Sequence, residues 1–394
     1  MARLLSFALF LSIMITLTGA GHYYVWSRLV RDPGLPPGTT RILSYALIFL
    51  FLAIPGSLFL RRSAWGGAAE GLVWLAMTWL GLLLFLTLAL CVADLARGVW
   101  LVVRASRAAG DPGALDPERR QVLARLVAGA AALTAGALGL WSLRSALGRV
   151  QVRRVEVTLG RLPQALSGVR IVQLSDVHVG PTIHRSFIET IVRQCNQLAP
   201  DVLVITGDLV DGSVEELRQH TAPLAELRAK YGVFFVTGNH EYYSGAEEWC
   251  TELTRLGIRV LRNERVNIGD EGGSFDLAGV DDHSAQRFGG GHGEDLPKAL
   301  SGRDPARELV LLAHQPRTIL EAQAHGVGLQ LSGHTHGGQL WPWTYLVRLQ
   351  QPVVAGLARF GKSLVYVSRG TGYWGPPMRL GAPSEITELT LRAG

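Results

Sequence analysis

The residues best suited to chemistry form five short motifs in the second half of the chain. Each motif follows an apolar stretch that predicts a β-strand, and each carries carboxylate, amide or imidazole groups. The motifs are Asp176-Val177-His178, Gly207-Asp208-Leu209-Val210-Asp211, Gly238-Asn239-His240-Glu241, His314, and Gly333-His334-Thr335-His336-Gly337-Gly338-Gln339. Residues two apart in an extended segment point the same way, so Asp176 and His178 can share one ion. Imidazole and carboxylate suit first-row metals, and the five motifs together predict a metal-dependent hydrolase.

Each motif also has a structural explanation when it is taken alone. An Asp after a strand is commonly a helix cap or a turn residue. Asn239 could form a turn, and His314 could be a core histidine with satisfied hydrogen bonds. The functional interpretation therefore depends on the coincidence of all five motifs at strand ends.

The elements that must position these motifs alternate along the second half of the chain. Strands are predicted at residues 169–174, 201–206, 233–237, 258–261, 275–280, 309–313, 329–332, 364–368 and 386–391. Helices are predicted at residues 186–198, 215–230 and 247–256. The alternation predicts a largely parallel sheet, and the strand-rich end predicts a second sheet packed on the first. Ligand sites in such sheets form beyond the carboxyl ends of strands, where the motifs fall.

The order of the motifs resembles the calcineurin-like metallophosphoesterase family. The resemblance covers residues 170–391 and is strongest to the small, membrane-anchored or exported bacterial phosphodiesterases, through residues 333–339 and the closing Ser368-Arg369-Gly370-Thr371-Gly372. It implies an α/β fold, a four-layer αββα sandwich. It also implies two divalent metal ions that share Asp208 as a bridge. The first ion would be bound by Asp176, His178, Asp208 and His336, and the second by Asp208, Asn239, His314 and His334.

The same resemblance assigns His240 to the substrate phosphate rather than to a metal. Two ions about 3.5–4 Å apart can clamp an in-line displacement at phosphorus, and a hydroxide between them is the expected nucleophile. His240 would stabilise charge or protonate the leaving oxygen, which is typically worth ~10²–10⁴-fold. Asp211 and Glu241 are expected to orient ligands or to cap helices. A donor set without thiolate fits manganese, iron or zinc, and the expected substrate is a phosphomonoester or phosphodiester.

The first part of the chain predicts a membrane anchor. We assign residues 1–148 to about four transmembrane helices and residues 149–394 to the metallophosphoesterase domain. The spans lie near residues 4–20, 42–60, 72–93 and 126–143, each close to the ~20 residues that a crossing helix needs. The first span could instead be a signal peptide, because small residues follow it.

The arginines indicate both the role of the positive charge and the orientation. The formal net charge is +6, with many arginines in membrane-flanking loops and no basic run with interleaved aromatics, so nucleic-acid binding is not expected. A slight arginine excess follows spans one and three, which favours a catalytic domain outside the cytoplasm. Arg119-Arg120 also resembles a twin-arginine export signal, although an ordinary charged helix start explains it equally well. We therefore expect an integral membrane protein.

Two aromatic stretches bear on the substrate. Residues 340–349 and 373–377 suit a membrane interface, which makes a lipid with a phosphodiester or pyrophosphate a candidate substrate. Packing over a sheet edge explains them as well. Two other functions stay open, a non-catalytic metal-binding sensor or scaffold and a regulatory domain of a membrane transporter. The complete ligand set with His240 argues against the first, and the lack of ionisable residues in mid-span argues against the second.

Overall fold

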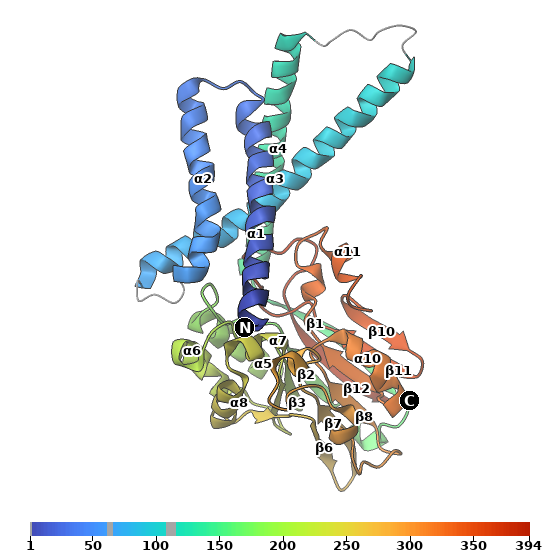
Figure 1. The fold of residues 1–394 in the computed structure, drawn as a ribbon. Coiled ribbons are helices and arrows are strands. Elements are labelled where there is room, and N and C mark those ends of the chain that lie inside the picture. Colours follow the sequence, from blue (N-terminus) through green and yellow to red (C-terminus); the bar gives the residue numbers. More distant parts are fainter. Residues whose placement is uncertain (1, 61–65, 108–115) are drawn as a thin grey trace. The chain divides into compact units, whose positions relative to one another are not determined.

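The computed structural model describes residues 2–60, 66–107 and 116–394 (Figure 1). Two compact units can be separated. The first runs up to Arg144 and includes Gly375–Met378, and the second comprises Ser145–Trp374 and Arg379–Gly394.

The first unit consists of long apolar helices. They are α1 Ala2–Trp26, α2 Pro37–Leu60, α3 Gly66–Arg107 and α4 Pro117–Leu147, with a π-helical turn Ser27–Arg31 after α1. Among the residues that the structure describes, three segments are long and apolar enough to cross a membrane, namely Pro37–Ser57, Ala69–Arg104 and Pro117–Leu147. The predicted span near residues 4–20 lies in α1, outside these three, and the predicted number of about four is close to the number found.

Polar contacts between α1 and α3 lie inside this helical unit. The ring of His22 is buried; its Nδ1 lies 2.7 Å from the Thr18 carbonyl oxygen, and its Nε2 accepts the indole N–H of Trp79 at 2.8 Å. The Tyr24 hydroxyl donates to Asp94 at 2.7 Å. Because both ring nitrogens of His22 have partners, this histidine serves helix packing.

The second unit is built on two six-stranded sheets. In spatial order, the first sheet contains β1 Gln151–Leu159, β12 Glu385–Ala393, β2 Arg170–Leu174, β3 Val202–Thr206, β4 Val233–Val236 and β5 Arg259–Val260. The second contains β10 Gly356–Phe360, β11 Ser363–Val367, β9 Leu329–Ser332, β8 Leu309–Leu312, β7 Gly273–Gly279 and β6 Glu264–Asp270. Strands β2 to β5 run parallel, and so do β7, β8 and β9. Each sheet thus has a run of neighbouring carboxyl ends at one edge.

Helices cover the outer face of each sheet. On the first sheet these are α5 Arg185–Gln197, α6 Val214–Thr221 and α8 Ala246–Arg255, and near the second lie the short α9 Leu296–Ala299 and α10 Ile319–Ala322 (Figure 1). Successive residues of β2 face opposite layers, because Ile171 packs between the two sheets while Val172 and Leu174 pack against the helices. The predicted four-layer αββα fold is therefore confirmed.

One predicted helix, at residues 215–230, is wrong beyond Thr221. Helix α6 ends there, and a short 3-10 helix follows at Ala222–Glu226. Pro223 has no backbone N–H, so it cannot continue the α-helical hydrogen bonds. Three strands, β1, β6 and β10, were absent from the prediction.

Candidate metal centre

The predicted site residues come together at the carboxyl ends of strands from both sheets. Asp176 and His178 follow β2, Asp208 follows β3, and His314 follows β8. Asn239 and His240 begin α7 (Asn239–Ser244), directly after β4, and His334 and His336 follow β9. Three neighbouring strands of the first sheet and two of the second therefore supply the eight side chains.

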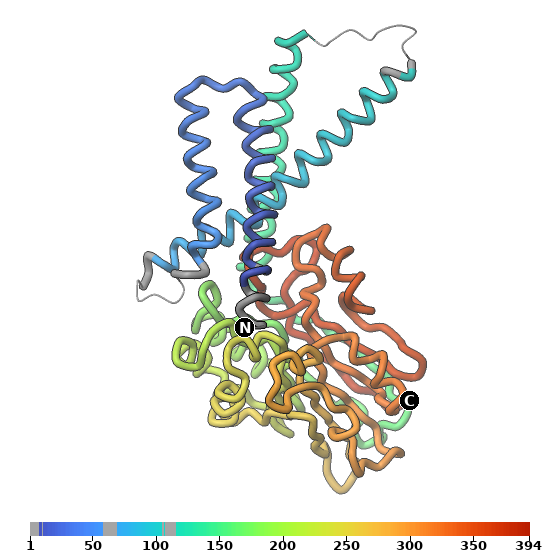
Figure 2. The backbone as a smooth tube through the Cα atoms, viewed as in Figure 1, coloured from blue at the N-terminus to red at the C-terminus, as the bar shows by residue number. Residues whose placement is uncertain are grey.

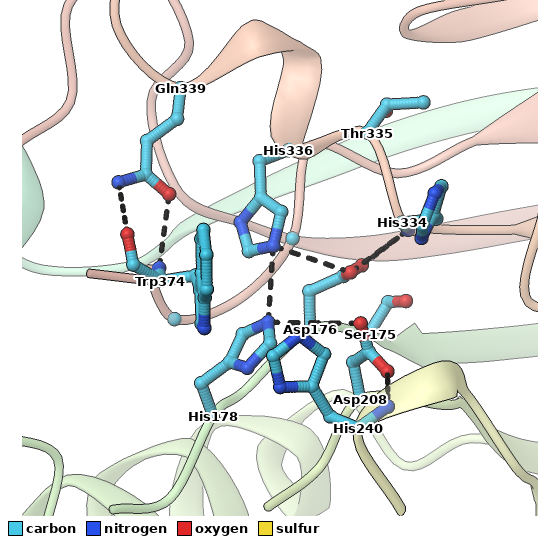
Figure 3. Close-up of polar contacts among 12 residues, drawn as sticks. Ser175, Asp176, His178, Asp208, His240, His334, Thr335, His336, Gln339 and Trp374 are labelled. Atoms are coloured by element: carbon cyan, nitrogen blue, oxygen red, sulfur yellow. Dashed lines mark hydrogen bonds and ion pairs between the residues drawn. The ribbon is translucent and has the colours of Figure 1, made fainter. Parts of the chain in front are cut away.

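A first group of ligand atoms belongs to Asp176, His178 and His336, and these atoms lie within 4.8 Å of one another. The Nε2 atoms of His178 and His336 are 3.1 Å apart, and His336 Nε2 is 3.5 Å from Asp176 Oδ1 (Figure 3). His178 Nδ1 lies 3.1 Å from Asp211 Oδ1. Since this carboxylate holds the Nδ1 side of the ring, Nε2 is the atom turned toward the group.

A second group comprises Asp208, His314 and His334. His314 Nε2 lies 3.0 Å from Asp208 Oδ2 and 3.2 Å from His334 Nδ1. A carbonyl can only accept, so the 2.8 Å contact from His314 Nδ1 to the Thr206 oxygen fixes a proton on Nδ1, and Nε2 is the ring atom through which His314 could bind a metal ion. Asn239 Oδ1 is buried with no hydrogen-bond partner in the described part of the chain, as a metal ligand would be in the absence of its ion.

Asp208 connects the two groups. Its Oδ2 is 3.0 Å from His314 Nε2 and 4.0 Å from His178 Nε2. Its Oδ1 accepts the backbone N–H of His240 at 2.9 Å. One carboxylate oxygen therefore faces a histidine of each group, which is the position that a bridging ligand requires.

The backbone at this centre is strained. Five residues other than glycine adopt left-handed φ angles, namely Asp176 at 51°, His178 at 55°, Asp208 at 51°, His334 at 71° and His336 at 50°. Such angles are costly for residues with a Cβ and tend to occur at functional sites. Gly333 is needed for close approach, because a Cβ there would collide with the Asp176 carboxylate.

The electrostatics act differently on the individual groups of this centre. Burial raises the pKa of Asp176, and the nearby Asp208 charge adds to the rise. For Asp208, burial acts the same way, but the charges of His314 and His240 outweigh it and hold its pKa well below its usual range. Burial, aided by the charge of His314, lowers the pKa of His334 to about 4. An ionised Asp208 and a neutral His334 are the forms that a metal ion requires.

His240 lies beside the two groups rather than within them. Its Nδ1 is 2.6 Å from Asp211 Oδ1, and its side chain is 16 % exposed. Burial lowers its pKa, but Asp208 and the hydrogen bond with Asp211 outweigh burial and raise the pKa to about 9. The rings of Tyr243 and Trp374 flank it at 5.4 and 5.6 Å between centroids. His240 is therefore a protonated group next to an aromatic wall at neutral pH.

Arg379 is a buried part of the centre that the sequence did not reveal. Its guanidinium donates to the carbonyls of Gly372 at 2.9 Å and of Arg369 and Ala382 at 2.8 Å each. It also lies 3.4 Å from His336 Nδ1. Arg379 thus holds residues 369–372 beside His336, a predicted metal ligand. Nothing in the local sequence Pro-Pro-Met-Arg indicates this role.

Asp282 is a second residue that the prediction passed over. It is fully buried just beyond β7 and accepts hydrogen bonds from the Ser284 N–H at 2.8 Å and from Gln315 Nε2 at 3.1 Å. Its charge helps to raise the pKa of His314. Its position after an apolar strand is the signal that could have identified it, since the five motifs share that position.

Comparison with known proteins identifies the family of this chain. Residues 169–338 match the calcineurin-like phosphoesterase family. The chain is 36% identical over 402 residues to a transmembrane protein with metallophosphoesterase domain from Danio rerio, across 98% of this chain and 89% of that protein. It is 32% identical over 392 residues to an uncharacterized metallophosphoesterase from Campylobacter jejuni, across 98% of this chain and 99% of the other. The structure of a dimetal phosphatase from Danio rerio shares 15% identity, over 52% of this chain and 88% of that one, with a TM-score of 0.34.

Fold and site together define a membrane protein with a metallophosphoesterase domain. The chain belongs to the calcineurin-like phosphoesterase family, as its motifs predict. Its apolar helices agree with the transmembrane relative. The family and the two His/Asp groups indicate divalent metal ions.

Proposed function

We propose that the protein is a membrane-anchored hydrolase of phosphomonoesters or phosphodiesters that uses a pair of divalent ions, manganese, iron or zinc. The observation that carries this proposal is the position of Asp208 Oδ2 between His178 of one ligand group and His314 of the other. The unpartnered Asn239 oxygen completes the second group. The ligands without thiolate suit these three metals.

Each ion would have its own set of ligands, and the two sets would share Asp208. One ion would be held by Asp176, His178, Asp208 and His336, and the other by Asp208, Asn239, His314 and His334. When bound, such a pair lowers the pKa of water and neutralises phosphoryl oxygens, which supplies the nucleophile and the charge stabilisation for hydrolysis. Asp211 and the Thr206 carbonyl keep two of the imidazoles in the orientation that this requires.

His240 is the proposed catalytic acid. Asp211 occupies its Nδ1, so Nε2 is the ring atom free to reach the substrate. The raised pKa keeps a proton on the ring at neutral pH. In the proposed reaction His240 stabilises the phosphoryl group and gives this proton to the leaving oxygen.

The membrane anchor bears on the location of the catalytic domain and on the class of substrate. We propose that residues 1–148 anchor the chain and that the catalytic domain, residues 149–394, lies outside the cytoplasm, on the side that the arginine distribution favours. A lipid phosphoester is the substrate that a bilayer-tethered site would meet at the highest local concentration. We therefore include lipids among the proposed substrates.

Metal analysis and turnover of the full-length protein in nanodiscs test the proposal. We expect two bound ions, hydrolysis of bis(4-nitrophenyl) phosphate, loss of activity on chelation and recovery on addition of manganese or zinc. Asp208→Asn should reduce both metal content and turnover, whereas Asp304→Asn, at an exposed loop position outside the motifs, should change neither. Two bound ions without turnover on any ester would instead favour a metal-binding sensor or scaffold.

A further inference from the structure

Residues Trp341–Leu349, which we name the interfacial segment, expose large apolar side chains. The segment contains the short helix α11 Thr344–Val347. Its exposed fractions are 55% for Trp341, 52% for Trp343, 59% for Tyr345, 48% for Leu346 and 82% for Leu349. Single exposed apolar residues are common, but five in nine positions form a patch that marks an interaction surface.

The backbone of the interfacial segment is nevertheless fixed. The Trp341 N–H donates to the Leu380 carbonyl at 3.0 Å, and the Thr344 hydroxyl donates to the Gly337 carbonyl at 3.3 Å. Gly338 packs so closely on Thr344 that a Cβ would collide with its backbone. Figure 2 follows this excursion of the chain between β9 and β10. An ordered backbone that holds apolar side chains outward is preorganised for binding.

The charge around the segment selects the kind of partner. The chain contains no Asp or Glu between Glu321 and Glu385. Arg348 in the segment and Arg359 and Lys362 of the neighbouring hairpin are exposed. Tryptophan, tyrosine and leucine combined with cations suit the interface of an anionic bilayer. A lipid surface is also a partner that a chain with segments apolar enough to cross a membrane would meet.

The segment is joined to the metal centre through Gln339. This side chain donates to the Trp374 carbonyl at 2.8 Å and accepts the Trp374 N–H at 3.0 Å (Figure 3). Trp374 is 52% exposed, and its ring lies against His240. Gln339, two residues before the segment, therefore fixes the position of the exposed tryptophan that contacts the group we propose as the acid.

We propose that the interfacial segment lies in the headgroup region of an anionic bilayer and that the metal centre takes its phosphoester from a lipid in that bilayer. The docking of the segment on the bilayer concerns only the surface of the protein. The lipid substrate rests on the proposed function. The tests below separate the two.

The position of the segment is measured with a spin label at Leu349→Cys in full-length protein, in nanodiscs of phosphatidylcholine and phosphatidylglycerol in equal parts. Cys91 is exposed and is replaced by alanine, whereas Cys195 and Cys250 are buried and stay. We expect the label to be more accessible to oxygen than to a nickel chelate. A label at Leu320, which is 55% exposed on α10, should show the opposite. A water-exposed label at 349, or one immobilised by a second copy or a protein partner, would overturn the bilayer assignment.

The substrate class is measured by turnover of two lipids in the nanodisc, phosphatidic acid and phosphatidylglycerol, relative to soluble bis(4-nitrophenyl) phosphate. Leu349→Glu removes an apolar contact and adds a repelled charge, so we expect the ratio of lipid to soluble turnover to fall about tenfold. The matched Leu320→Glu should leave the ratio unchanged. An unchanged ratio in Leu349→Glu, or turnover of the soluble ester alone, would refute the lipid assignment. Inactivity on all esters would instead refute the proposed function, while the spin-label result would still decide the docking surface.

Discussion

Replacing His240 with alanine should separate metal binding from catalysis. The backbone N–H of residue 240 binds Asp208 Oδ1 at 2.9 Å, and alanine keeps this N–H. The metal ligands should therefore keep their geometry. What disappears is the proton at Nε2, and one positioned acid is typically worth ~10²–10⁴-fold. We expect a loss of that size in kcat, or about 3–5 kcal/mol of transition-state stabilisation.

The identity of the leaving group shows whether His240 acts as an acid. A 4-nitrophenolate leaves without a proton, but an alkoxide does not, so the alanine variant should lose far more turnover on an alkyl ester than on a nitrophenyl ester. Metal content is measured on the same samples. The matched control is His283→Ala, since His283 also follows a strand but pairs with Glu294 at 2.7 Å. Equal loss on both esters would refute the acid role, and loss of metal would refute the claim that His240 is not a ligand.

Two further changes test the residues behind the ligands. Arg379→Lys should lower the melting temperature by several degrees and weaken metal binding. One ammonium cannot reach the carbonyls of Gly372, Arg369 and Ala382 together, and each buried carbonyl without a partner costs ~1–3 kcal/mol. An unchanged melting temperature and metal affinity would argue against this role. Asp211→Asn removes a carboxylate that stabilises protonated His240, so the pKa of the ring falls and the alkaline limb of the kcat profile should move to lower pH; an unmoved limb would exclude this coupling.

The strands that the sequence predicts include every interior strand of the two sheets and one edge strand, β5. Strands β3 and β8, for example, are apolar runs buried along their whole length, so composition alone identifies them. The three strands that were missed, β1, β6 and β10, are all edge strands. An edge strand buries fewer side chains, and β1 is exposed over most of its first six residues. Its position depends on backbone pairing with β12 at the other end of the domain, which a local pattern does not contain.

The candidate site divides in the same way. The predicted ligands stand in short motifs after interior strands, where polar residues are conspicuous against apolar neighbours. Arg379 has no such context, and Trp374 stands only in an aromatic stretch; both reach the centre because the chain after β11 folds back on His336 and His240. Supporting residues of this kind become visible only when the chain is folded.

The conflict between stability and metal binding is sharpest at Asp176. Burial raises its pKa, so the folded state disfavours the ionised carboxyl. Without metal, the domain therefore loses stability as the pH rises from the unfolded pKa through the folded pKa. Its φ of 51° adds strain that asparagine tolerates well.

Asp176→Asn should therefore stabilise the metal-free protein while it weakens the first metal group. The amide oxygen can still accept the His334 N–H, which reaches Asp176 Oδ1 at 2.8 Å. Each kcal/mol gained should raise the melting temperature by about 2–4 °C in a domain of this size. With metal in excess the order should reverse, because binding at 1,000 times Kd stabilises the native protein by about 4.1 kcal/mol. Thermal unfolding of both proteins with chelator and with manganese provides the measurement, and a variant that melts below the wild type in chelator would show that the Asp176 carboxylate does not destabilise the empty centre.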